Sequence, residues 1–167
     1  MTKQIADRQG DVTLVHCDDI NPGDLITQHS GTSADIKPVK GRIVLAEGEV
    51  TGHAHTLKPQ GVTFFKPFGM PTGHSLLVVT EATVERGSLL EGELLGTMPG
   101  GTLRFKLTDG TVMRFAPDDV EIVKQGVKVK RAYTPLTHDE HDAIPVGVGV
   151  YTVMQHQTAD ARAMRHI

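Results

Sequence analysis

The sequence predicts a mainly β fold, a small barrel or sandwich of short antiparallel strands followed by a C-terminal helix. Three observations predict it. The 18 Gly and 9 Pro residues divide the chain into short segments, these segments are rich in Val, Ile, Leu, Thr and Phe, and helical periodicity is nearly absent. The length of 167 residues suits one domain, residues 1–167, with its own hydrophobic core.

Ten segments are expected to form strands, because each combines β-branched or aromatic residues with turn formers at its ends. They are 11–16, 41–50, 61–65, 75–84, 89–95, 102–108, 111–115, 120–123, 127–132 and 146–155. Segment 20–40 is rich in turn formers and predicts a long ordered loop. Residues 157–167 favour a helix, with Thr158 as its N-cap.

The Asp109-Gly110 pair predicts a tight hairpin, because both residues accept the positive φ angles of a type I′ turn. A two-residue loop would place Phe105 opposite Arg114, so that neither face of the hairpin is uniformly apolar. We therefore expect either a longer loop or a bulge. With a second short loop at 124–126, segment 88–131 is a candidate inserted β-barrel subdomain.

Charge and hydropathy exclude several classes of partner. The 17 basic and 20 acidic residues leave a net charge of −3, which gives no overall field to hold nucleic acid or an anionic membrane. No apolar run approaches the roughly 20 residues of a membrane span, and the first residues lack the apolar core of a signal peptide. These features predict a cytoplasmic protein, or a virion protein if it is a phage structural component.

We expect no catalytic or binding role for the single cysteine or for the one group of basic residues. Cys17 is the single cysteine, which excludes an internal disulfide. One basic group, comprising Lys124, Lys128, Lys130 and Arg131, is expected to be a solvated strand face over inward-pointing Val127 and Val129. An RNA- or DNA-binding role would need an aromatic platform, which this segment lacks, so we do not expect nucleic acid as a partner.

The segment Gly52-His53-Ala54-His55 carries the first motif that points to chemistry. Histidines two residues apart on a strand project from the same face and can reach one ion. Neutral imidazole suits Zn, Ni, Cu or Fe, and Gly52 leaves room for the strand to bend as it opens into a site. Glu49 lies just before this pair.

The second motif is Thr137-His138-Asp139-Glu140-His141-Asp142. His138 and His141 share a face only if this segment makes a helical or 3₁₀ turn, which Thr137 could cap together with Glu140. The three acidic residues provide carboxylates that either bind a metal or hydrogen-bond to its ligands.

If the two motifs meet in space, they form a complete site for a divalent transition metal, Zn, Ni, Fe or Mn. The ligands would be His53, His55, His138 and His141. Glu49 and Glu140 are the nearest candidates for a general base. The alternative is that both motifs are exposed polar turns, since nine histidines make chance pairs common. His74, which follows a Gly turn, is a candidate additional ligand.

The elements Val44 to His55 and Leu136 to Pro145 resemble hallmarks of a group of small bacterial and phage proteins. That group has no assigned activity, so the resemblance implies no reaction. The Gly-led His53-Ala54-His55 is also loosely similar to the metal-binding strand of cupin β-barrels. Lys58, Pro59 and Gln60 stand where cupins place a Glu, and this departure puts a true cupin in doubt.

Two functions follow from these motifs. The first is a metal-binding β-barrel protein, which is an enzyme only if one coordination position stays open to water. The second is a non-enzymatic structural or assembly protein, such as a phage virion or decoration component. In either case an edge-rich β protein is expected to form homo-oligomers or assembly contacts.

Overall fold

The computed structural model describes residues 6–17, 33–47, 54–67 and 74–155. These residues form a mainly β structure of short antiparallel strands, which confirms the predicted fold class. The expected helix at 157–167 and residues 20–32 of the expected loop at 20–40 lie outside the described residues. Within that loop Ser33–Asp35 forms a strand instead, because it pairs with residues 65–67. No helix among the described residues is long and apolar enough to cross a membrane.

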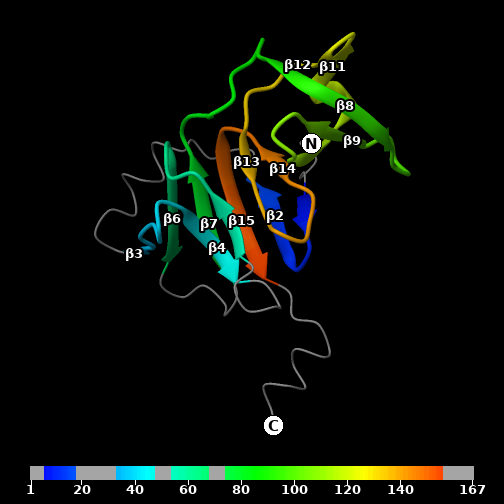
Figure 1. The fold of residues 1–167 in the computed structure, drawn as a ribbon. Helices are drawn as coiled ribbons and strands as arrows, with labels where there is room; N and C mark the ends of the chain where they lie inside the picture. The colour runs from blue at the N-terminus through cyan, green and yellow to red at the C-terminus, as the bar shows by residue number, and fades with distance from the viewer. Residues whose placement is uncertain (1–5, 18–32, 48–53, 68–73, 156–167) are drawn as a thin grey trace.

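The large sheet has six strands in the order β1-β2-β15-β7-β6-β3 (Figure 1). These strands are β1 Ala6–Gln9, β2 Val12–His16, β15 Gly149–Gln155, β7 His74–Val79, β6 Val62–Pro67 and β3 Ser33–Asp35. Alternate residues of β2, such as Val12 and Leu14, point into the core, as a half-buried strand requires.

Two short ribbons contribute to the same core. They are β4 Ile43–Glu47 with β5 Ala54–Leu57, and β13 Thr134–Leu136 with β14 Ile144–Val146. Their buried residues Leu57, Leu136 and Val146 pack in one cluster with Leu14 and Leu77 of the large sheet. The predicted strand 146–155 is thus two elements, because the chain leaves β14 and enters the large sheet as β15.

The small sheet has five strands in the order β10-β9-β8-β12-β11 and lies beyond one end of the large sheet (Figure 1). The strands are β8 Leu89–Thr97, β9 Leu103–Leu107, β10 Val112–Phe115, β11 Val120–Val123 and β12 Gly126–Val129, with a 3₁₀ turn η1 at Pro117–Asp119. A second core, centred on Phe105, Met113 and Phe115, lies under this sheet. All five strands fall within segment 88–131.

The hairpin between β9 and β10 has the longer loop that the sequence allowed. Gly110 has a φ of 93°, its N–H donates to Leu107 O over 2.9 Å, and Leu107 N–H donates to Thr111 O. This register places Phe105 opposite Met113, so one face is apolar. It also places Arg104 directly opposite Arg114, a like-charge pair that would be unfavourable without an anion nearby.

Candidate histidine site

His55 lies in the interior of the protein, on β5, with 0% of its surface exposed. The neighbouring residue, Thr56, pairs with Thr137 through two backbone hydrogen bonds of 2.9 Å. Arg42 strengthens this contact by donating a hydrogen bond to the Thr137 hydroxyl over 2.9 Å. This pairing brings the second histidine motif beside the first, across 81 residues of sequence.

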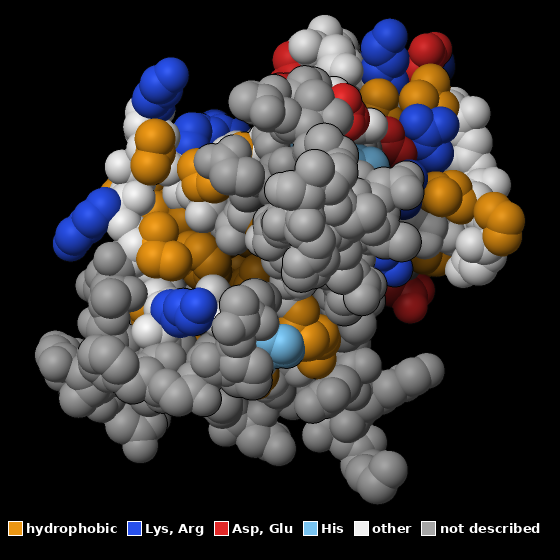
Figure 2. Space-filling view, turned by 90° about the horizontal axis from the view of Figure 1, so that it is seen from below, with side chains coloured by type: hydrophobic (Ala, Val, Ile, Leu, Met, Phe, Trp, Pro, Cys, Tyr) orange, Lys and Arg blue, Asp and Glu red, His pale blue; other side chains and the backbone are white. Residues whose placement is uncertain are grey.

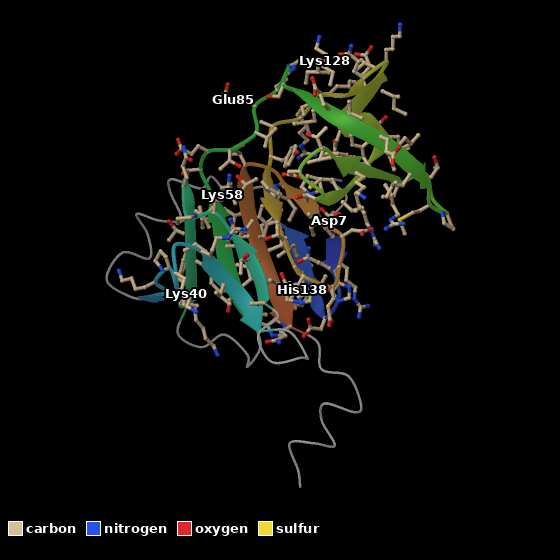
Figure 3. All side chains as sticks on the ribbon, viewed as in Figure 1. Asp7, Lys40, Lys58, Glu85, Lys128 and His138 are labelled. Carbon is tan, nitrogen blue, oxygen red and sulfur yellow. The ribbon has the colours of Figure 1, made fainter. Side chains whose placement is uncertain are left out.

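Three of the four predicted ligands come together. The ring centroids of His55 and His138 are 4.3 Å apart, those of His138 and His141 are 4.7 Å apart, and those of His55 and His141 are 6.3 Å apart. His53, the fourth predicted ligand, lies outside the described residues, as does Glu49. Figure 3 shows His138 at the lower end of the large sheet.

Both ring nitrogens of His55 are hydrogen-bonded to buried groups near the β1–β2 turn. Nδ1 lies 2.8 Å from Gln9 Oε1, and Nε2 lies 2.8 Å from Asp11 Oδ1. Gln9 donates both amide hydrogens to backbone carbonyls, that of Leu136 over 2.8 Å and that of Asp142 over 3.0 Å. Its oxygen must therefore accept, which fixes a hydrogen on Nδ1 of His55.

The contact between His55 and Asp11 then needs a cation. With Nδ1 protonated, neutral His55 has only a lone pair on Nε2, and an ionised Asp11 has only lone pairs on Oδ1. Two such atoms at 2.8 Å repel unless a proton or another cation lies between them. Burial is the largest cause that lowers the pKa of His55, the Asp11 hydrogen bond opposes it, and His138 and His141 lower it further. A proton on Nε2 is consequently held weakly.

The remaining two histidines lie in the irregular segment between β13 and β14. His138 is half-buried, and its Nδ1 accepts a hydrogen bond from the Glu140 N–H over 3.0 Å. His141 is exposed, and its ring lies on Gly10, where an added Cβ would be 2.5 Å from Nε2. Gly10 has a φ of 57°, so both the turn and the ring contact favour glycine there.

The predicted capping of this segment is wrong. No helical turn forms between β13 and β14, because the Thr137 hydroxyl donates to Thr56 O over 3.3 Å instead of capping Glu140. His138 and His141 face each other through the bend that the Glu140 hydrogen bond closes. Glu140, the candidate general base, is exposed in the same bend.

Asp142 links this site to the small sheet. Its carboxylate accepts hydrogen bonds from Arg104 over 2.7 and 3.1 Å and from Arg114 over 2.9 Å. The Arg104 hydrogen bond is the largest cause that lowers the pKa of Asp142, and Arg114 lowers it further. Asp142 is thus the anion between the two opposed arginines of the β9–β10 hairpin.

As the side chains stand, no three His, Cys, Asp or Glu groups among the described residues are arranged to hold a metal ion. The pair nearest to such a site is His55 with Asp11, and His141 lies above the adjacent Gly10. Sequence reasoning missed both Gln9 and Asp11, since neither lies at a ligand spacing from a histidine. The Gly10-Asp11 turn between two strands was the one local signal for them.

The other polar residues singled out from the sequence lie elsewhere. His74 is the first residue of β7 and pairs with Met154. Lys128 is exposed on β12 while Val127 and Val129 are buried, as expected for a solvated strand face. Lys128 stands opposite Glu121 of β11.

A family model described as a domain of unknown function (DUF8820) matches residues 8–98, more than half of the chain. The matched segment includes Gln9, Asp11 and His55, and ends before His138 and His141. No curated protein and no solved structure matches the chain.

Proposed function

Given that the chain belongs to the family described as a domain of unknown function (DUF8820), we propose that it binds a divalent transition metal ion between His55 and Asp11. The observation that carries this proposal is the 2.8 Å contact of His55 Nε2 with Asp11 Oδ1 while Nδ1 holds its hydrogen for Gln9. That position needs a cation, and a metal ion supplies one by displacing the weakly held proton.

The environment of His55 supports this assignment. Metal-binding histidines usually donate their second N–H to a fixed acceptor, which orients the ring and raises its basicity. Gln9 is such an acceptor, because two backbone carbonyls hold its amide in place and only 2% of its surface is exposed. Gln155 holds Asp11 in the same way by donating to Oδ2 over 3.2 Å.

His141 and His138 would complete the site. His141 is exposed and its ring lies on Gly10, the residue before Asp11, so we expect a rotation of this side chain to bring the ring to the metal. His138 must release the Glu140 N–H before Nδ1 can bind a metal. Three imidazoles and one carboxylate suit Zn²⁺ and related ions such as Ni²⁺, Fe²⁺ or Mn²⁺. If His138 stays on Glu140, the fourth position is open to water, and Glu140 is then the neighbouring general base.

Calorimetric titration with Zn²⁺ in two buffers of different ionisation enthalpy tests this proposal. We expect one binding event per chain that releases a proton, because the metal replaces the proton on His55 Nε2. His141→Ala should weaken binding at least tenfold, and the matched control His74→Ala should leave it unchanged. Zn²⁺ binding without proton release, or with equal affinity in His141→Ala, contradicts the proposal.

A second candidate function is non-enzymatic assembly, and the exposed apolar side chains of the small sheet favour it. Leu89, Leu94 and Leu95 of β8 are 53%, 41% and 44% exposed, and Ile122 of β11 is 54% exposed. Hydrophobic side chains also reach the surface in the view of Figure 2. Such groups are common in protein contacts, including those of homo-oligomers and virions. Sedimentation of the wild type against Leu94→Lys tests this function, with dissociation as the expected result.

A further inference from the structure

A cavity of about 470 Å³ lies between the large and the small sheet, apart from the histidine site. Its walls come from β1, the end of β2, the β8–β9 turn, β10, the η1 turn, the segment before β13, β14 and the start of β15. This volume lies within the usual range for small-molecule sites, which often form where two structural units meet. Asp7 marks the large-sheet side of the cavity in Figure 3.

Among the charged side chains that line this cavity, which also include Asp118, three do not contact each other. Asp7, Asp119 and Arg131 influence one another electrostatically. Among the described residues, however, no hydrogen bond or ion pair joins any two of these three side chains. A structural role would bring Arg131 into contact with one of the carboxylates, as Arg104 and Arg114 contact Asp142. The three charges are instead held apart around open space.

The two carboxylates carry unfavourable charge at this position. Although Asp7 as a whole is exposed, loss of water around its carboxylate is the largest cause that raises its pKa, and the charge of Asp119 raises it further. Burial is likewise the largest cause that raises the pKa of Asp119, and Arg131 lowers both. A ligand cation near both carboxylates would relieve this cost.

Each of the other two arginines of the cavity wall already donates one hydrogen bond through Nε. Arg114 donates to Asp142 over 2.9 Å, and Arg8 Nε donates to Gly10 O over 2.8 Å. In the described part of the chain, Arg131 is the arginine of this wall whose side chain forms no hydrogen bond or ion pair, so its guanidinium has all its donors available for a ligand anion. Tyr151 and Tyr133 also line the cavity and have pKa values raised to about 12, so both phenols stay neutral at physiological pH.

We propose that this cavity binds a small zwitterion of the amino-acid type. Its ammonium group lies between Asp7 and Asp119, and its carboxylate forms a forked contact with Arg131, as a guanidinium favours. The apolar body lies against Pro145 and Tyr151 of the wall. A purely anionic ligand such as a phosphate would be repelled by the two carboxylates, and a purely cationic one would leave Arg131 without a partner.

Titration of ¹⁵N-labelled protein with the series from glycine to 6-aminohexanoate tests the proposal and measures the distance between the two charge sites. Butylammonium and butyrate, which each carry one charge, are the comparison ligands. We expect the best zwitterion to bind at least tenfold more tightly than either, since each ligand charge finds a partner of opposite sign. The shifted amides should include those of Asp7, Asp119 and Arg131.

The variants Asp119→Asn and Arg131→Gln should each weaken the best zwitterion at least tenfold. Glu121→Gln and Lys128→Gln, on strands β11 and β12 outside the cavity, are the matched controls and should leave binding unchanged. Amide spectra establish that each variant is folded, and Arg131→Lys gives a conservative version of the arginine change. Absence of binding by the whole series, equal binding of butylammonium, or unchanged affinity in Arg131→Gln would overturn the proposal. EDTA-treated protein should bind the zwitterion equally well, which separates this test from the metal proposal.

Discussion

The histidine site and the cavity between the sheets differ in how their polar and charged side chains are paired. At the histidine site Gln9, Asp11 and His55 are 2%, 8% and 0% exposed, and each is hydrogen-bonded. At the cavity Asp7, Asp119 and Arg131 share a space without a direct contact. Polar groups that satisfy one another hold a fold together, whereas unpaired charges around a space lower its stability and leave interactions open for a ligand.

One residue connects these two regions. Asp142 binds Arg114, which lines the cavity, and its backbone carbonyl accepts the Gln9 amide that orients His55. Substitutions on either side can therefore be compared on one scale, the free energy of unfolding. Removing a residue of the histidine site should destabilise the protein, whereas neutralising a carboxylate of the cavity should stabilise it.

The largest effect is expected for His55→Ala. It removes a fully buried ring and leaves Gln9 Oε1 and the Asp11 carboxylate without their partner. The loss should be about 3–5 kcal/mol in the free energy of unfolding, as for a broken buried pair. Urea denaturation monitored by circular dichroism measures it, with His74→Ala as the control that changes stability much less. A loss below about 1 kcal/mol would show that the buried network contributes little.

An intermediate effect is expected for Asp142→Asn. The carboxylate accepts from two arginines that oppose each other across β9 and β10, so its removal leaves a like-charge pair. Because Arg104 and Arg114 are 40% and 39% exposed, solvent reduces the cost to about 1–2 kcal/mol. The same urea titration applies, and the double variant with Arg104→Gln should recover part of the loss. No recovery would exclude repulsion between the arginines as the cause.

The smallest effect, of opposite sign, is expected for Asp119→Asn. The pKa of Asp119 is raised in the folded protein, so its ionised form is less favourable there than in the unfolded chain. Above the ordinary aspartate pKa the charge therefore costs stability, and below it the cost disappears because both states bind the proton. We expect a higher melting temperature than wild type at pH 7 and no difference at pH 3. A lower melting temperature at pH 7 would assign Asp119 a structural role.

The sequence predicted all five strands of the small sheet because alternation and turn residues act over a few neighbours, but it missed β1 and β13 and placed β3 in a loop. Segment 120–123 forms β11 with the predicted bounds, and Gly110 marks the hairpin loop. The shared site was predicted only on the condition that the two motifs meet, and the rings of His55, His138 and His141 do lie close together. The capping of Glu140 by Thr137 failed because pairing with Thr56, a distant residue, took the hydroxyl.

The partners of these motifs depend on contacts that no local pattern encodes. Gln9 reaches Leu136 and Asp142 across more than a hundred residues, with sequence separations of 127 and 133. The cavity likewise needs Asp7 of β1 and Asp119 of η1 to face the same space, which depends on how the two sheets are placed. Neither residue stands in a motif, so the sequence gives no reason to choose them over other aspartates.

Elemental analysis of protein purified without an affinity tag decides whether the chain holds a metal ion between His55 and Asp11. Wild type loaded with Zn²⁺ and dialysed should retain about one equivalent per chain, as a single site between His55 and Asp11 requires. The folded variants Asp11→Asn and His141→Ala should retain much less, and His74→Ala should match wild type. A wild type that retains no metal after loading, or an Asp11→Asn variant that retains a full equivalent, would contradict the claim.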